Sequence, residues 1–246
     1  MCLSGAKSET AQQLKDVLNL NSLSNHDIIK MNNELIKTVN NDLGEEIIIN
    51  TANKIYPNSN FELENSFVDT VKNHFHGEIE QVDFSNAAAS SKTINDWVLV
   101  KTNKKIKELI DEKDIDKLTK LILVNTFYFK GSWDEKFNAN NTSKEDFNCA
   151  DGSIVQVDMM KLRGKKFKIL DNVLDISGQV CTFPYVGQIS MTIFLPNENT
   201  KLEVLENQLT PSKLKEILHL EIGNSLVNAY IPKFKMEFKA DVIQSI

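Results

Sequence analysis

The chain has 246 residues, 41% of them hydrophobic, which is enough to bury a large core within a single domain. Its formal net charge at pH 7 is −6, with 28 basic and 34 acidic residues, and this balance argues against a nucleic-acid partner. No run of 18 apolar residues occurs, so no membrane span is expected, and the first residues do not form a signal peptide.

Helical spacing of apolar residues recurs along the chain. It predicts a first helix near residues 10–18, followed by the helices 27–40, 64–76, 93–110, 201–209 and 211–220. The last of these has the clearest start, because Thr210 can cap it and Pro211 fits the first helical position.

Strands are predicted where β-branched and aromatic residues alternate with polar ones. The ranges are 45–56, 78–84, 166–171, 180–185, 190–195, 226–231 and 233–238, with the strongest strand inside 117–137. Helices come mainly first and strands mainly later, without βαβ alternation. This order favours an α+β fold with helices packed on largely antiparallel sheets, and nothing in the sequence marks a domain boundary.

The strongest strand covers residues 121–131 and has apolar residues on both faces, which predicts a central strand that is buried on both sides. Alternation places Asn125 on the same face as Leu123 and Phe127. A buried amide without partners costs about 1–3 kcal/mol. Asn125 is therefore expected to belong to a hydrogen-bond network.

The segment LILVNTFYFKGSWDEKF (121–137) resembles the central-strand signature of the serpin family. Further segments match the family pattern in the same order, and together they span essentially the whole chain: GAKSETAQQL (5–14), FHGEIEQVDFSN (75–86), INDWVLVKTNKKIKELI (94–110), VDMMKLRGKKFKI (157–169), PYVGQISMTIFLPNE (184–198) and YIPKFKMEF (230–238). The resemblance implies a single serpin domain over residues 1–246 that is incomplete at both ends.

Serpins trap proteases through an exposed reactive loop that is cleaved and then inserts as a new strand into the main sheet. The resemblance implies that Asn125 lies at the region where this sheet opens, the shutter, and that Trp133 lies at the breach, where insertion begins. It places the helix that covers the sheet, and must shift, at residues 86–103. The reactive loop, its scissile bond and the final core strands of the pattern have no counterpart among these residues.

The resemblance therefore implies an endopeptidase inhibitor, not an enzyme, with a serine protease as the expected target and cysteine proteases as a second class. The 246 residues alone are expected not to inhibit. Two alternatives stay open: a non-inhibitory serpin acting as carrier, chaperone or storage protein, and a truncated product without function.

The remaining chemistry of the sequence is sparse, and no cofactor is expected. His74 and His76 lack metal-ligand neighbours at suitable spacing, so no metal site is predicted. Two lysine-rich clusters (101–107 and 161–168) are interpreted as solvated charge, and polyanion binding is disfavoured.

Cys2, Cys149 and Cys181 are too few for a disulfide framework. Asn140 and Asn141 head overlapping N-glycosylation sequons, which agree with an extracellular protein, whereas a cytoplasmic location is the alternative.

Overall fold

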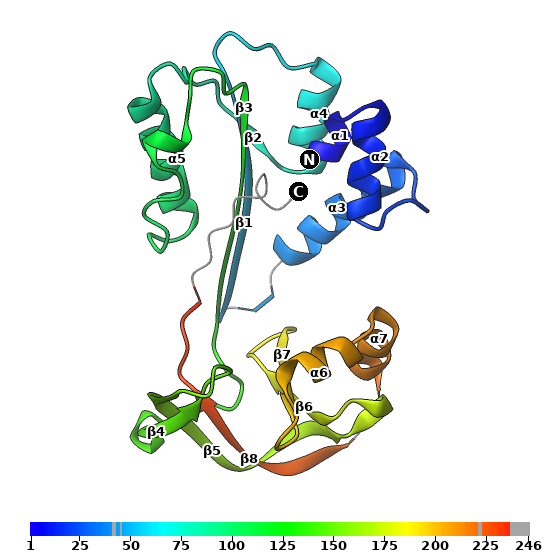
Figure 1. Cartoon of the computed structure of the whole chain (residues 1–246), viewed down its shortest axis with the longest axis vertical. Coiled ribbons are helices and arrows are strands. Elements are labelled where there is room, and N and C mark those ends of the chain that lie inside the picture. The colour runs from blue at the N-terminus through cyan, green and yellow to red at the C-terminus, as the bar shows by residue number, and fades with distance from the viewer. Residues whose placement is uncertain (41–42, 45, 221–222, 237–246) are drawn as a thin grey trace. The chain divides into compact units, whose positions relative to one another are not determined.

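The structure is a computed structural model that describes residues 1–40, 43–44, 46–220 and 223–236. The chain divides into two compact units (Figure 1). The described part of the first unit consists of residues 1–40, 43 and 48–130, and that of the second of residues 44, 46–47, 131–220 and 223–236. The single domain predicted from the sequence stays a prediction, because a division into compact units does not by itself define domains.

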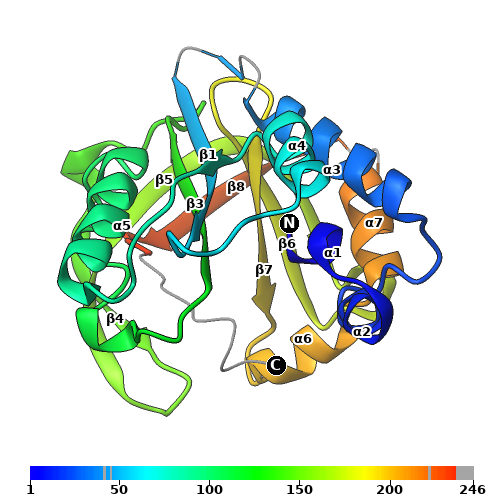
Figure 2. The ribbon, with the colours of Figure 1, turned by 90° about the horizontal axis from the view of Figure 1, so that it is seen from above.

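The first unit has a three-stranded sheet in the order β2-β1-β3, with β1 parallel to β2. Helices lie on either side of β1 and β3, with α5 on one side and α1 to α4 on the other (Figures 1 and 2). Its elements are α1 (Cys2–Gly5), α2 (Ser8–Val17), α3 (Asn25–Asn40), β1 (Ile47–Pro57), α4 (Asn65–His74), β2 (Glu78–Ile79), α5 (Ala87–Lys101), the short 3₁₀ helix Glu112–Asp114 and β3 (Leu121–Gly131).

The core of this unit lies between α5 and the sheet. Its buried members are Tyr56, Val82, Phe84, Ile94, Val98, Ile115 and Val124. Ile94 and Val98 are one helical turn apart on α5, and both are fully buried. The apolar stripe of α5 therefore fixes which face of the sheet the helix covers.

The second unit contains a five-stranded sheet in which the strands β4, β5, β6 and β7 follow one another and β8 also pairs with β5. The strand pairs of its described residues are antiparallel, as the sequence predicted. Its elements are the 3₁₀ helix Ala139–Asn141, β4 (Ser143–Asn148), β5 (Ile154–Asp171), the 3₁₀ helix Val173–Asp175, β6 (Gly178–Pro184), β7 (Ser190–Pro196), α6 (Leu202–Gln208), α7 (Pro211–His219) and β8 (Asn224–Pro232).

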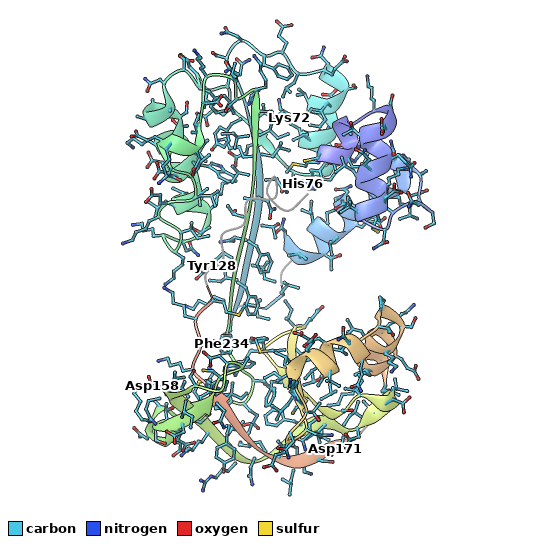
Figure 3. All side chains as sticks on the ribbon, viewed as in Figure 1. Lys72, His76, Tyr128, Asp158, Asp171 and Phe234 are labelled. Atoms are coloured by element: carbon cyan, nitrogen blue, oxygen red, sulfur yellow. The ribbon has the colours of Figure 1, made fainter. Side chains whose placement is uncertain are left out.

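Strand β5 organises the second unit because it pairs with a different strand along each part of its length. Its first part pairs with β4, its middle with β8 and its last residues with β6. Asp158 and Asp171 mark two distant points of this strand in Figure 3. The sequence predicted only residues 166–171 of β5 and missed β4, since exposed charged residues interrupt the hydrophobic alternation there.

Several predicted boundaries differ from the structure. The helix predicted at 93–110 is α5, which begins at Ala87 and ends at Lys101. Asn103 and Lys104 have positive φ angles, which stop the helix although apolar spacing continues beyond them. The strand predicted at 233–238 is wrong for residues 233–236, and residues 237–238 lie outside the described part. Thr210 caps α7 as predicted, because its side chain accepts a hydrogen bond from the Lys213 N–H.

Candidate functional site: an uncovered strand, its helix and an aromatic cluster

Strand β3 lies at the edge of the three-stranded sheet formed by the described residues, with β1 as its neighbour. Val124 and Thr126 are buried on the face that α5 covers, whereas the side chain of Phe127, on the other face, is 61% exposed. The prediction of a central strand buried on both faces is therefore wrong for the described structure. The physical reason is that both faces are apolar, but the face that carries Asn125 and Phe127 is only partly covered and is exposed at these two residues.

Asn125 belongs to a hydrogen-bond chain that crosses the sheet. Its Nδ2 donates to Oδ1 of Asn53 on β1 at 2.8 Å, and Nδ2 of Asn53 donates to the Phe75 carbonyl oxygen at the end of α4 at 3.1 Å. The predicted hydrogen bonds of Asn125 are thus present, but the prediction that this amide is buried is wrong, because Asn125 is exposed. The sequence left Asn53 unnoticed, although a polar residue within a β-branched run was a signal for it.

The Asn125–Asn53 pair gives a first test of this chain. Replacing Asn53 by alanine breaks both hydrogen bonds and should destabilise the first unit by about 1–2 kcal/mol, whereas Asn125→Ala breaks one and should cost about 1 kcal/mol. Urea unfolding of both single variants and of the double variant measures the coupling between the two side chains. Additive effects of the two substitutions would show that the hydrogen bond contributes nothing.

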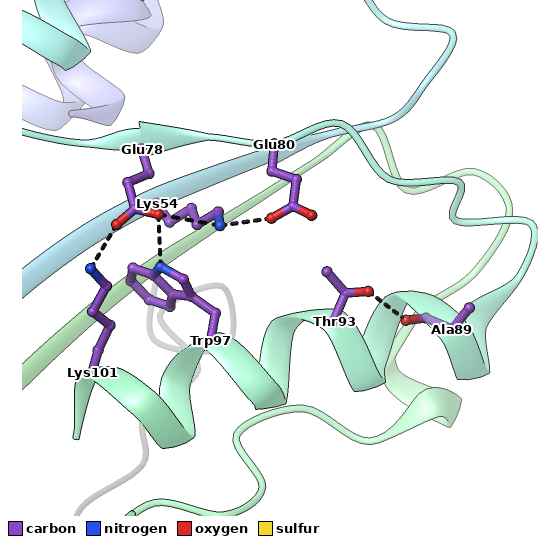
Figure 4. Close-up of polar contacts among 7 residues, drawn as sticks. All are labelled: Lys54, Glu78, Glu80, Ala89, Thr93, Trp97 and Lys101. Carbon is purple, nitrogen blue, oxygen red and sulfur yellow. Dashed lines mark hydrogen bonds and ion pairs between the residues drawn. The ribbon is translucent and has the colours of Figure 1, made fainter. Parts of the chain in front are cut away.

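A charged network attaches α5 to the sheet (Figure 4). Lys54 on β1 is only 6% exposed, and its Nζ lies 2.7 Å from Glu80 Oε2 and 3.3 Å from Glu78 Oε2. From α5, Lys101 Nζ lies 2.7 Å from Glu78 Oε1, and the indole N–H of Trp97 donates to Glu78 Oε2 at 3.0 Å. Two cations therefore share one carboxylate across the boundary between helix and sheet.

The ionisation of Glu78 follows from these contacts. Partial burial is the largest single influence and would raise its pKa. The hydrogen bonds from Lys101, Trp97 and Lys54 together outweigh it and hold the pKa below its ordinary value. Burial, and then the nearby carboxylates of Glu80 and Glu78, raise the pKa of Tyr56, whose hydroxyl has no hydrogen-bond partner among the described residues. The network thus favours a negative carboxylate and a neutral phenol.

Trp133, in the second unit, is the centre of an aromatic cluster. Its ring stacks on Tyr185 with centroids 4.3 Å apart, and it meets Phe137 and Phe183 edge-on at 6.1 and 6.3 Å. A backbone hydrogen bond joins the same two segments, because the Asp134 N–H donates to the Pro184 carbonyl oxygen. Within the second unit, Trp133 therefore anchors the segment 131–137 to the end of β6.

The two sequon asparagines lie on the surface of the second unit. Asn140 and Asn141 belong to the 3₁₀ helix Ala139–Asn141, both are exposed, and Asn138 caps that helix. Their accessibility suits modification, but the modification itself stays a prediction.

Within the described ranges, no group of three or more histidine, cysteine or acidic residues is placed to hold a metal ion. No described helix combines the length and apolar character needed to cross a membrane. The three cysteines are free, and Cys2 is exposed.

A family model described as serpin (serine protease inhibitor) matches residues 1–246. Among curated relatives, Serpin B6 of Macaca fascicularis and Serpin B3 of Homo sapiens are each 34% identical over 98% of this chain. Neuroserpin of Gallus gallus is 31% identical over 97% of it. The chain spans 65%, 66% and 59% of these three proteins, respectively.

Solved structures agree in fold. Cleaved Serpin 42Da superposes with a TM-score of 0.83 at 31% identity and covers 96% of this chain, which spans 62% of that structure. Cleaved kallistatin, solved in complex with heparin, superposes with a TM-score of 0.85 at 25% identity over 94% of this chain and 68% of its own. Serpins are in general protease inhibitors rather than enzymes. The signature around Asn125 and Trp133, the α+β fold and these matches together establish that the chain belongs to the serpin family.

Proposed function

We propose that this chain is the larger part of an endopeptidase inhibitor that traps a serine protease by inserting a cleaved reactive loop beside β3. The observation that carries the proposal is the edge position of β3, which has no strand on its far side among the described residues. An added strand would pair with this edge and cover the exposed side chain of Phe127. Because the chain spans about 65% of its curated relatives, the activity is proposed for a polypeptide of their length.

Two features of the first unit support a sheet that opens. Asn125 and Asn53 connect β3 to β1 through side chains, and the network at Lys54 connects α5 to β1 and β2. Both are polar contacts that can be exchanged for others when strands or helix shift. We assign Asn125 to the opening region on this basis, and Trp133 to the fixed end from which opening begins.

The location of the protein is part of the proposal. Exposed asparagines in two overlapping sequons support an extracellular protein, with a cytoplasmic one as the alternative. Endoglycosidase treatment of protein secreted from cultured cells distinguishes them, because a shift in mass that Thr142→Val and Ser143→Ala together abolish requires passage through the secretory pathway.

Complex formation tests the inhibitory mechanism. We expect a polypeptide of the relatives' length to form an SDS-resistant complex with a trypsin- or chymotrypsin-like protease, and the 246-residue chain to form none. Cleavage of the longer polypeptide without any such complex would favour the alternative of a carrier, chaperone or storage protein. A complex formed by the 246-residue chain itself would contradict the proposed role of the inserting loop.

A further inference from the structure

The second unit carries a surface hollow of about 570 Å³ that the proposed inhibitory function does not use. All the residues that line it are polar or cationic except Leu162, and none of them is acidic. They are Lys136, Asn138, Asn140, Asn141, Ser143, Lys161, Leu162, Arg163 and Lys165. Such a lining offers hydrogen-bond donors from ammonium, guanidinium and amide groups to a ligand that is itself polar.

Carboxylates beside the hollow neutralise its three lysines. Lys136 Nζ lies 3.1 Å from Glu46 Oε2, and Lys165 Nζ lies 2.5 Å from Glu135 Oε2. Lys161 forms an ion pair with Glu145, and its Nζ also lies 2.9 Å from Ser143 Oγ. The three pairs cancel three positive charges without placing a carboxylate in the lining.

Arg163 supplies the positive charge that is left. It is the only arginine of the chain, and its guanidinium forms no direct ion pair among the described residues, although the hydrogen bond from Lys161 and, to a lesser extent, the charge of Arg163 lower the pKa of the nearby Glu145. The guanidinium lies over the ring of Tyr230, 6.0 Å from its centroid. A planar guanidinium held in this way can bind an oxyanion through two parallel hydrogen bonds.

Arg163 lies at a β-bulge between β5 and β8. The register between β5 and β8 shifts between Leu162 and Lys165, and Gly164 has a φ angle of +62°. The Gly164 N–H donates to Oδ1 of Asn228 at 2.9 Å, which fixes the bend. Bulges of this kind redirect side chains next to binding sites.

We propose that this hollow binds a sugar-sized ligand that carries one sulfate or phosphate ester, with the Arg163 guanidinium as the principal contact of the oxyanion. The four cations of the lining and the three carboxylates beside it leave a net charge of +1, which matches one anionic group and distinguishes this site from a surface for a long polyanion. The amide of Asn138, which heads no glycosylation sequon, suits sugar hydroxyls. The volume lies within the range of small-molecule sites, about 300–1,000 Å³.

Titration of the unglycosylated 246-residue chain tests the site with N-acetylglucosamine 6-sulfate, its 6-phosphate and the uncharged sugar, followed by calorimetry and saturation-transfer NMR. We expect the sulfate or the phosphate sugar to bind and the uncharged sugar to bind at least about tenfold more weakly. A preference for the sulfate sugar would identify a singly charged ester as the ligand, and a preference for the phosphate sugar a phosphoryl group. Equal binding of the uncharged sugar, or no binding of any of the three, would overturn the proposal.

Three variants make the test specific. Arg163→Gln should weaken binding about tenfold or more, whereas Lys105→Gln, which removes one exposed positive charge in the first unit, should leave it unchanged. Glu145→Gln leaves the charge of Lys161 uncompensated and should strengthen binding about threefold or more, a gain that a misfolded variant cannot give. Binding that ignores Arg163→Gln, or that Glu145→Gln weakens, would contradict the assignment.

Discussion

Replacement of Trp133 by alanine is expected to lower the free energy of unfolding of the second unit by about 3 kcal/mol. Truncation of a large aromatic residue in a core lowers the free energy of unfolding by about 3–5 kcal/mol. We expect the lower end of this range because Trp133 is only partly buried. The loss includes the stacking on Tyr185 and the edge contacts to Phe137 and Phe183. Hydrogen exchange of amides in β6, followed in urea, measures the effect on this unit.

Phe147→Ala is the matched control, because Phe147 lies on β4 of the same unit and is 41% exposed. It should cost about 1 kcal/mol or less. Trp133→Phe retains part of the cluster and should fall between the two. If Trp133→Ala lowers the free energy of unfolding no more than Phe147→Ala does, Trp133 does not anchor the cluster. The physical argument for placing Trp133 at the breach would then fail.

Replacement of Lys54 by alanine is expected to destabilise the attachment of α5 by about 2–3 kcal/mol. Removing one partner of a buried ion pair costs about 3–5 kcal/mol, and the half-exposed side chains of Glu78 and Glu80 regain some hydration. Amide exchange within α5 measures this attachment locally. Because the contacts hold the pKa of Glu78 below its ordinary value, its contribution is present at neutral pH and is lost as the pH falls through the folded-state pKa.

Two further variants separate charge from packing. Lys92→Ala removes the i,i+4 pair with Asp96 on α5, whose side chains are 75% and 61% exposed, and should cost at most about 0.5 kcal/mol. The double variant Lys54→Met and Glu80→Gln removes a buried cation together with one of its two anions, and we expect it to recover most of the loss. If Lys54→Ala and Lys92→Ala cost the same, the network at Lys54 is not what holds the helix.

The sequence predicted the parts of this structure that local chemistry determines. Thr210 and Pro211 predicted the start of α7 because capping needs only neighbouring residues. The helix predicted from spacing at 93–110 was misplaced, whereas the family resemblance, at 86–103, was closer to the observed α5. Hydrophobic periodicity alone cannot predict the positive φ angles at Asn103 and Lys104 that end α5.

The candidate site was predictable only in part. The sequence predicted a hydrogen-bond network at Asn125 from the cost of burying an amide, but Asn125 is exposed, so that reason does not apply. Its partner, Asn53, is 72 positions away and depends on strand pairing. Lys54 resembles any strand lysine in the sequence, and its burial between Glu78 and Glu80 results from the packing of β1, β2 and α5. Residues whose roles arise from tertiary contacts leave little local signal.

Strand β5 has a consequence for how the protein is made on the ribosome. The middle residues of β5 pair with β8, and the β8 residues lie more than fifty positions later in the chain than their partners on β5. During synthesis, the stretch around Leu162 and Phe167 therefore emerges long before Ala229 and Ile231, the residues that complete its core cluster. Until then an apolar strand edge stays open. We expect the nascent chain to bind chaperones within this interval, and ribosome profiling of chaperone-bound nascent chains to place release only after β8 has left the exit tunnel.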